Sequence, residues 1–145
     1  MILSIKDANI DNWRDLINLS VKKNQAKFIE SNLLSIAESK FETSWKPVGI
    51  YNESTLIGFA MYGKLKDNRV WLDRFMIDYR YQCRGYGKKS LDFLINHLFN
   101  FYTCNEIYLS IYEDNISAID LYISVGFEFN GELDDNGEKV MVLVL

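Results

Sequence analysis

A turn with two closely spaced glycines, between a strand-like and a helix-like segment, constrains the fold of this chain most. The strand-like segment, Arg69–Asp78, is dense in β-branched and aromatic residues, which favour a central strand. The segment Gly87–Phe101 repeats leucine, isoleucine and phenylalanine with helical spacing, which predicts an amphipathic helix. The turn between them reads Gln-Cys-Arg-Gly-Tyr-Gly-Lys over residues 82–88. This order is typical of an α/β chain that can hold an anion where the helix begins.

The same turn is therefore a candidate phosphate-binding loop. The unpaired N–H groups in the first turn of a helix and the positive end of its dipole attract an anion. Gly85 and Gly87 let the backbone approach that anion closely, and Gln82, Arg84 and Lys88 offer side-chain donors. Two other nucleotide-binding loops fit less well. A Walker loop needs Gly-x-x-x-x-Gly-Lys-Ser/Thr, and a dinucleotide fold needs Gly-x-Gly-x-x-Gly near the first strand.

The remaining periodicity predicts one domain over residues 1–145, with the element order βαα-βββ-α-β-α-ββ. We expect an α/β (α+β) sandwich built around one mixed sheet. The further predicted strands are Ile2–Lys6, Pro47–Tyr51, Leu56–Gly63, Glu106–Tyr112, Phe127–Gly131 and Lys139–Leu145, and the further predicted helices are Ile10–Val21, Ala26–Phe41 and Asn115–Val125.

Charge and cysteine content exclude several classes of function. Lys and Arg number 16 against 20 Asp and Glu, so no positive excess exists to neutralise nucleic acid, whereas a cationic substrate is permitted. Cys83 and Cys104 are too few for a disulfide framework and lack metal-ligand spacing. No apolar run approaches the roughly 20 residues that span a bilayer, and no secretory signal pattern is present. We expect a cytoplasmic protein with neither a metal nor a membrane partner.

A second motif lies far from the glycine loop in sequence. Asn115 and Tyr122 share one predicted helix, which Gly126-Phe127 follows. With Gln-x-x-Gly-x-Gly at 82–87, this pattern resembles the GNAT family of N-acetyltransferases over essentially the whole chain. The resemblance implies a mostly antiparallel sheet with splayed central strands, acetyl-CoA as co-substrate and a homodimer. The chain is further similar to bacterial spermine/spermidine acetyltransferases, which implies a polyamine acceptor, through Trp-Leu-Asp-Arg-Phe at 71–75, Phe-Ile-Glu at 28–30 and Asn-Gly-Glu-Lys-Val-Met-Val at 136–142.

The resemblance also implies where acetyl-CoA binds. In this family the pantetheine pairs with the central strand where it parts from the next strand, and the diphosphate lies on the glycine loop. Two splayed parallel strands leave main-chain donors free to bind amides and to polarise a thioester carbonyl. The side chains of the strand are expected in the core, and Asn115 either is only the N-cap of its helix or caps the helix and contacts the co-substrate as well. The implied contact residues are Phe75, Met76, Ile77, Gln82, Cys83, Arg84, Gly85, Tyr86, Gly87, Lys88, Asn115 and Tyr122.

Tyr122 matches the general acid of the family. Transfer of an acetyl group to an amine requires a group that takes a proton from the ammonium and a group that protonates the leaving thiolate. Tyr122 lies seven residues after Asn115, and hence on the same helix face two turns on. The alternative is an aromatic core residue. Direct attack by the amine needs no acyl-enzyme, so Cys83 is not expected to act as a nucleophile.

Asp73 is the predicted general base, acting directly or through water, and also a predicted substrate ligand. Strict alternation places Asp73, Phe75 and Ile77 on one face of the strand, with Leu72, Arg74 and Met76 on the other. The alternative is a structural salt bridge from Asp73 to Arg69 or Lys66. Some polyamine acetyltransferases carry two adjacent acids here, whereas this chain has Asp73-Arg74, which argues against a two-carboxylate relay.

Glu30 is the second predicted substrate ligand, because two separated carboxylates suit an acceptor with amines several carbons apart. The alternative for Glu30 is an exposed helix residue. His97, the only histidine, is expected to have a packing role. Two other functions stay open: acetylation of another amine, such as a protein N-terminus, an amino acid or an aminoglycoside, and a non-catalytic sensor that binds acetyl-CoA.

Overall fold

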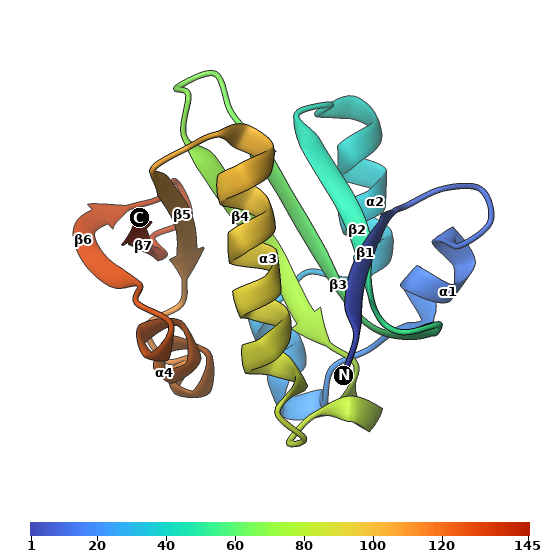
Figure 1. The fold of residues 1–145 in the computed structure, drawn as a ribbon. Helices are drawn as coiled ribbons and strands as arrows, with labels where there is room; N and C mark the ends of the chain where they lie inside the picture. Colours follow the sequence, from blue (N-terminus) through green and yellow to red (C-terminus); the bar gives the residue numbers. More distant parts are fainter.

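The computed structural model describes all residues 1–145 and places seven strands in one sheet (Figure 1). The strand order is β1-β2-β3-β4-β5-β7-β6, and every neighbouring pair is antiparallel except β4 and β5. The predicted element order and the mixed, mostly antiparallel sheet are confirmed. The elements are β1 (Leu3–Asp7), α1 (Trp13–Asn18), the 3₁₀ helix η1 (Lys23–Phe28), α2 (Asn32–Phe41), β2 (Trp45–Asn52), β3 (Thr55–Lys64), β4 (Val70–Ile77), the 3₁₀ helix η2 (Tyr79–Tyr81), α3 (Tyr86–Tyr102), β5 (Glu106–Ile111), α4 (Ile116–Ser124), β6 (Glu128–Leu133) and β7 (Lys139–Val144).

Helices cover both faces of the sheet. On one face, Leu91, Leu94 and Leu98 of α3 are fully buried against strand residues in the larger core. On the other face, Leu16 of α1 packs with Phe59 and other strand residues in a smaller core. Figure 1 shows α3 lying across the near face, with α1 and α2 behind the sheet. No helix is both long and apolar enough to cross a bilayer.

The strands β4 and β5 splay apart after two paired positions. Val70 pairs with Ile107 and Trp71 pairs with Tyr108, although β4 continues to Ile77. Figure 1 shows the two strands diverging below this short contact. The edge of β4 that faces β5 therefore keeps its backbone N–H and C=O groups free of a strand partner over the second half of the strand.

A β-bulge at Asp73 shifts the side-chain alternation of β4. Arg74 pairs with Met61 and Leu72 pairs with Tyr62, so Asp73 has no partner on β3. An extra residue in one strand reverses which face the following side chains occupy. Leu72 accordingly packs in the larger core, whereas Met76 packs in the smaller core on the opposite face. The prediction that strict alternation holds along this strand is wrong.

The second predicted helix, Ala26–Phe41, is also wrong, because the chain forms two separate pieces. The 3₁₀ helix η1 ends at Phe28, and α2 begins at Asn32. The hydroxyl of Ser31 accepts a hydrogen bond from the N–H of Leu34 at 3.1 Å and caps α2. Glu30 thus lies in the connection between the two helices. A serine side chain that competes for backbone N–H groups ends the continuous helix that apolar spacing suggests.

The first predicted helix, Ile10–Val21, shortens to α1 for the same reason. The side chain of Asn9 accepts hydrogen bonds from the N–H groups of Asp11, at 2.8 Å, and Asn12, at 3.0 Å. This turn holds the chain out of helical geometry until Trp13.

Asp78, directly after β4, is a buried carboxylate that fixes the entry to the glycine loop. Its Oδ2 accepts from the N–H of Ser20 at 3.0 Å, and its Oδ1 accepts from Nε of Arg80 at 2.7 Å. Burial alone would raise the pKa of Asp78, but the hydrogen bonds from Arg80 and Ser20 lower the pKa overall. We expect Asp78→Ala to reduce the free energy of unfolding at pH 7 by about 2–4 kcal/mol, because Ser20 loses a buried acceptor.

Urea unfolding at several pH values measures this effect. The lowered pKa means that the carboxylate stabilises the fold above its unfolded pKa of about 3.9, and that this contribution is lost as the pH falls through the folded pKa. The difference in free energy of unfolding between wild type and Asp78→Ala should therefore become smaller in strong acid. The exposed Asp92→Ala, on α3, is the matched control and should cost under about 0.5 kcal/mol. Equal stability of both variants at pH 7 would refute the anchoring role.

Candidate active site

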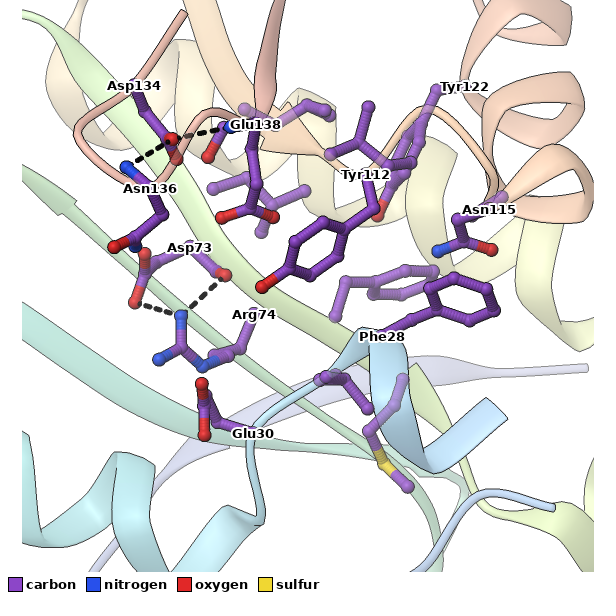
Figure 2. Close-up of a pocket in the computed structure, with 18 of the residues that line it drawn as sticks. Phe28, Glu30, Asp73, Arg74, Tyr112, Asn115, Tyr122, Asp134, Asn136 and Glu138 are labelled. Atoms are coloured by element: carbon purple, nitrogen blue, oxygen red, sulfur yellow. Dashed lines mark hydrogen bonds and ion pairs between the residues drawn. The ribbon is translucent and has the colours of Figure 1, made fainter. Parts of the chain in front are cut away.

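A large open cleft runs along the region where β4 and β5 splay. Its volume is about 1200 Å³, and η1, β4, the end of β5, the start of α4 and the β6–β7 hairpin all contribute to its lining. Figure 2 shows side chains from these distant segments converging on one space. Of the predicted site residues, nine line the cleft: Glu30, Asp73, Phe75, Met76, Ile77, Gln82, Gly87, Asn115 and Tyr122.

The glycine loop leads into α3 in a strained conformation that suits an anion. Gly85 is the residue before α3 and has φ of 82°, and Cys83 has φ of 61°, although it is not a glycine. The first helical hydrogen bond runs from the N–H of Lys89 to the carbonyl of Gly85. The backbone N–H groups of residues 83–88 have no acceptor within the chain. Free N–H groups at a helix start, with left-handed residues among them, form a concavity that fits a diphosphate.

Within that loop, the chain engages the side chains of Gln82 and Tyr86 and leaves those of Arg84 and Lys88 free. Nε2 of Gln82 donates to the carbonyl of Ile77 at 2.9 Å and to Oε1 of Gln25 at 3.0 Å. Gln82 therefore ties the loop to the end of β4 and to η1, and the prediction of a free side-chain donor at this position is wrong. Arg84 and Lys88 are exposed and form no ion pair within the chain. The side chain of Tyr86 packs against Tyr81.

Tyr122 joins the core through its ring and the cleft through its hydroxyl. The ring packs edge-on against Phe127, with centroids 5.6 Å apart. The hydroxyl forms no hydrogen bond within the chain, and Figure 2 shows it pointing toward the space between Tyr112 and Asn115. Burial raises the pKa of Tyr122 above its ordinary value, so the phenol keeps its proton at neutral pH. A protonated, unengaged phenol is a suitable donor to a developing thiolate.

Asn115 occupies the residue before α4, but its side chain does not cap the helix. Its backbone carbonyl accepts from the N–H of Ile119 at 3.0 Å, whereas its side-chain amide accepts no capping hydrogen bond. Asn115 is thus the N-cap residue by position, as predicted, but without a capping hydrogen bond from its side chain. Figure 2 shows the amide at the edge of the cleft, where it is available to a bound molecule.

Asp73 forms an ion pair with Arg74, and not with Arg69 or Lys66, the two partners that the sequence suggested. Its Oδ2 lies 2.8 Å from Nη1 of Arg74, whose Nη2 is 3.6 Å from Oε2 of Glu38. Arg69 instead forms a double hydrogen bond with Glu132, at 2.8 and 2.9 Å. Burial raises the pKa of Asp73 to about 6, against the opposing effect of the Arg74 guanidinium. The bulge brings neighbouring residues of one strand into this contact, which strict alternation would place on opposite faces.

The cleft is strongly acidic. Ten of its lining residues are acidic and only two, Lys27 and Arg74, are basic. Glu30, exposed in the connection between η1 and α2, is one of the acids. A concave surface with an excess of one charge raises the local concentration of oppositely charged ligands. No group of three or more histidine, cysteine or acidic side chains is arranged to hold a metal ion.

Sequence reasoning missed Glu138, Tyr112 and Phe28 as lining residues. Figure 2 shows the carboxylate of Glu138 directed into the cleft beside Asp73. Burial, followed by the neighbouring Asp134, raises the pKa of Glu138 to about 7. In sequence, residues 136–142 are recognisable as a stretch similar to polyamine acetyltransferases, but that similarity gives Glu138 no role. Because β7 inserts between β5 and β6, the turn before β7 reaches β4, whose Asp73 precedes Glu138 by 65 residues, which local patterns do not reveal.

Comparison with known proteins agrees with this architecture. A curated spermine/spermidine N(1)-acetyltransferase from Bacillus subtilis (strain 168) is 52% identical over 149 aligned positions, covering 98% of each chain. The PaiA N-acetyltransferase of Thermoplasma acidophilum, solved with coenzyme A, has a TM-score of 0.72 at 20% identity, with 100% of both chains covered. A spermidine N-acetyltransferase from Vibrio cholerae, solved with CoA and spermine, has a TM-score of 0.74 at 18% identity, covering 98% of this chain and 95% of that one.

At these low identities the two solved structures establish the fold. One structure of the Vibrio cholerae enzyme is dodecameric. Residues 12–127 match the acetyltransferase (GNAT) family, a span that contains β4, the glycine loop and Tyr122. Together with the curated relative, this match extends over nearly the whole chain. The chain belongs to the GNAT family of acetyltransferases.

Proposed function

We propose that residues 1–145 act as one domain that transfers the acetyl group of acetyl-CoA to a primary amine of a polyamine such as spermidine or spermine. The observation that carries this proposal is the acidic cleft, with ten acidic and two basic residues in its lining, beside a glycine loop whose backbone N–H groups are free. A polyamine carries several ammonium groups, which suit several separated carboxylates. The Bacillus subtilis relative, at 52% identity, supports the same acceptor class.

The roles within this site follow from the free groups of the chain. The backbone N–H groups of residues 83–88 bind the diphosphate of acetyl-CoA. The free edge of β4 at Phe75–Ile77 binds the pantetheine amides and orients the thioester. Bound there, acetyl-CoA supplies an electrophilic acetyl carbon for direct attack by the amine. Tyr122 protonates the leaving thiolate, and Asn115 contacts the co-substrate near the same end of the cleft.

Asp73 and Glu30 bind ammonium groups of the acceptor. Asp73 lies on the bulge of β4, and Glu30 lies in the η1–α2 connection, so the two carboxylates approach the cleft from different elements. Asp73 also remains a candidate to accept a proton, directly or through water. Its carboxylate is already held 2.8 Å from Arg74, which favours a binding role over proton transfer.

An amine panel with acetyl-CoA tests the proposal. We expect thiol release with spermidine and spermine at a kcat/KM at least about tenfold above that with a peptide N-terminus, an amino acid or an aminoglycoside. Mass spectrometry of the products confirms a single added acetyl group. Faster turnover with one of the other amines would reassign the acceptor. Tight acetyl-CoA binding without turnover of any amine would favour a sensor.

A homodimer is proposed as the assembly. All six residues of the edge strand β6 are exposed, including Phe129 and Leu133. An edge strand presents unpaired backbone groups that a second chain can pair with. Light scattering after gel filtration should give twice the chain mass of 17.0 kDa. A mass of one chain would contradict a dimer, and a much larger mass would favour a dodecamer-like assembly.

A cytoplasmic location is also proposed. Cys83 and Cys104 are both free thiols, and Cys83 is exposed on the glycine loop. Thiols persist in a reducing compartment. Cell fractionation should recover the protein with cytosolic markers, and recovery in a membrane or secreted fraction would contradict this location.

A further inference from the structure

Two carboxylates, Glu138 and Asp73, lie beside each other in the cleft but differ in their partners. Oδ2 of Asp73 is 2.8 Å from the Arg74 guanidinium, which occupies the carboxylate and opposes the rise in pKa that burial causes. Glu138 forms no ion pair with a basic side chain, and the neighbour within hydrogen-bonding reach of its carboxyl is the side chain of Asp134. Figure 2 shows its carboxylate directed into the cleft, next to Tyr112.

The backbone of Glu138 is held in place from both sides. Its N–H donates to Oδ1 of Asp134 at 2.8 Å, and its carbonyl accepts from the N–H of Asp134 at 2.9 Å. The N–H of Asn136 donates to the same carboxylate of Asp134 at 2.9 Å. This closed turn ends where β7 begins, so the side chain of Glu138 projects from a rigid hairpin rather than from a loose loop.

We propose that Glu138 is the general base that takes the proton from the acceptor ammonium, directly or through one water. This inference rests on the proposed function and refines it. Asp73, held by Arg74, then binds the ammonium group and does not carry the proton. The sequence alone favoured Asp73 as the base, because Glu138 lies on a hairpin that is far from β4 in sequence.

The surroundings of Glu138 suit this task at neutral pH. The charged groups that face it are Asp73 and Arg74 from β4 and Asp134 from its own turn. Burial raises the pKa of Glu138 most, Asp134 and Asp73 raise it further, and Arg74 lowers it, with a result of about 7. A base transfers protons best when its pKa lies near the operating pH. An arriving ammonium adds a positive charge and favours the ionised form that is needed.

The proposed acetyl transfer balances in protons and electrons. Glu138 removes one proton from R–NH₃⁺, and the nitrogen lone pair forms the C–N bond to the acetyl carbon. When the C–S bond breaks, its electron pair leaves with sulfur, and Tyr122 gives its phenol proton to the thiolate. The nitrogen loses a second proton, which restores Tyr122 through solvent, and Glu138 releases its proton to water. Each turnover therefore yields one amide, one thiol and one proton.

The test compares pH profiles of kcat/KM for spermidine in wild type, Glu138→Gln and Asp73→Asn. In wild type, activity should fall as the pH drops below about 7, because the base must be deprotonated. Glu138→Gln should lower kcat about a hundredfold and remove this acidic limb. Asp73→Asn should mainly raise KM and keep the limb. The acidic limb of the pH profile reports the coupled titration of Asp73 and Glu138. The variant in which the limb disappears therefore identifies the carboxylate that acts as the base.

Glu128→Gln is the matched control, since it removes one charge from the same hairpin, on exposed β6 outside the cleft. Its profile should match that of wild type. Glu138→Asp keeps a carboxylate at a shorter reach, so it should retain the acidic limb with an intermediate rate. A limb that persists in Glu138→Gln but disappears in Asp73→Asn would return the base role to Asp73 and overturn the proposal.

A thermal melt provides a readout that does not depend on turnover. A carboxyl whose pKa is raised on folding contributes stability that is present below its unfolded pKa and lost as the pH rises through its folded value. Glu138→Gln should therefore melt above wild type at pH 8 and close to wild type at pH 5. Failure of wild type to acetylate any polyamine would refute the proposed function. A normal wild type with an unaltered Glu138→Gln would refute only the role of Glu138.

Discussion

Tyr122→Phe is expected to lower kcat about a hundredfold or more while leaving the Kd for acetyl-CoA within about twofold. The reason is that the phenol is the donor for the leaving thiolate, whereas the ring supplies packing against Phe127. The hydroxyl has no hydrogen-bond partner within the chain, so its removal leaves no orphaned group and should not destabilise the fold. Steady-state kinetics with spermidine and calorimetry with acetyl-CoA measure the two quantities separately.

Tyr102→Phe is the control for this result. Its hydroxyl, on the last residue of α3, is buried without a partner and lies outside the cleft. Its loss should leave kcat unchanged and the stability equal or slightly higher. An unchanged kcat in Tyr122→Phe would remove the phenol from the chemistry and leave the ring as a packing element alone.

Gly85→Val is expected to raise the Kd for acetyl-CoA at least about tenfold, equivalent to about 1.4 kcal/mol. An added Cβ at this position meets no protein atom within 4 Å, so the new side chain starts in open space beside the N–H groups of residues 83–88. A diphosphate that binds those groups must approach the same space. The positive φ of 82° adds strain of about 1–2 kcal/mol, which the fold can absorb.

Gly131→Val separates this binding effect from the strain. Gly131 has φ of 88°, and an added Cβ there also meets nothing within 4 Å, but it lies on β6, outside the loop. Both variants should lose similar stability in urea unfolding, and only Gly85→Val should lose affinity in calorimetry. Near-normal acetyl-CoA binding by Gly85→Val would contradict the assignment of the diphosphate to this loop.

Local sequence patterns predicted the features that depend on neighbours in the chain. The strand, glycine turn and helix around Gly85 are set by propensity, backbone freedom and an apolar stripe, all of which are local. The two strands of the closing hairpin, β6 and β7, were likewise predicted, as Phe127–Gly131 and Lys139–Leu145. The family resemblance added the splayed strands and the placement of Tyr122 at the cleft, which periodicity alone left open.

Features that depend on pairing between distant segments were not predictable in this way. The bulge at Asp73 arises from the register against β3, and no residue type near Asp73 in the sequence indicates that the strand contains an extra residue. The ion pair with Arg74 follows from that bulge. The approach of Glu138 depends on β7 inserting between β5 and β6, which is a property of topology. The break between η1 and α2 required weighing one serine cap against a long apolar pattern.

Because Asp73 in β4 has no partner on β3, the number of residues in this strand is as important as their types. Upstream of Asp73, the even-numbered Val70 and Leu72 pack in the larger core under α3, whereas downstream the odd-numbered Phe75 contacts that core and Met76 lies in the smaller one. Deleting one residue between Val70 and Ile77 would restore a regular pleat and turn every later side chain to the wrong side. Relatives should therefore tolerate exchanges of residue type along this stretch far better than a gap of a single position.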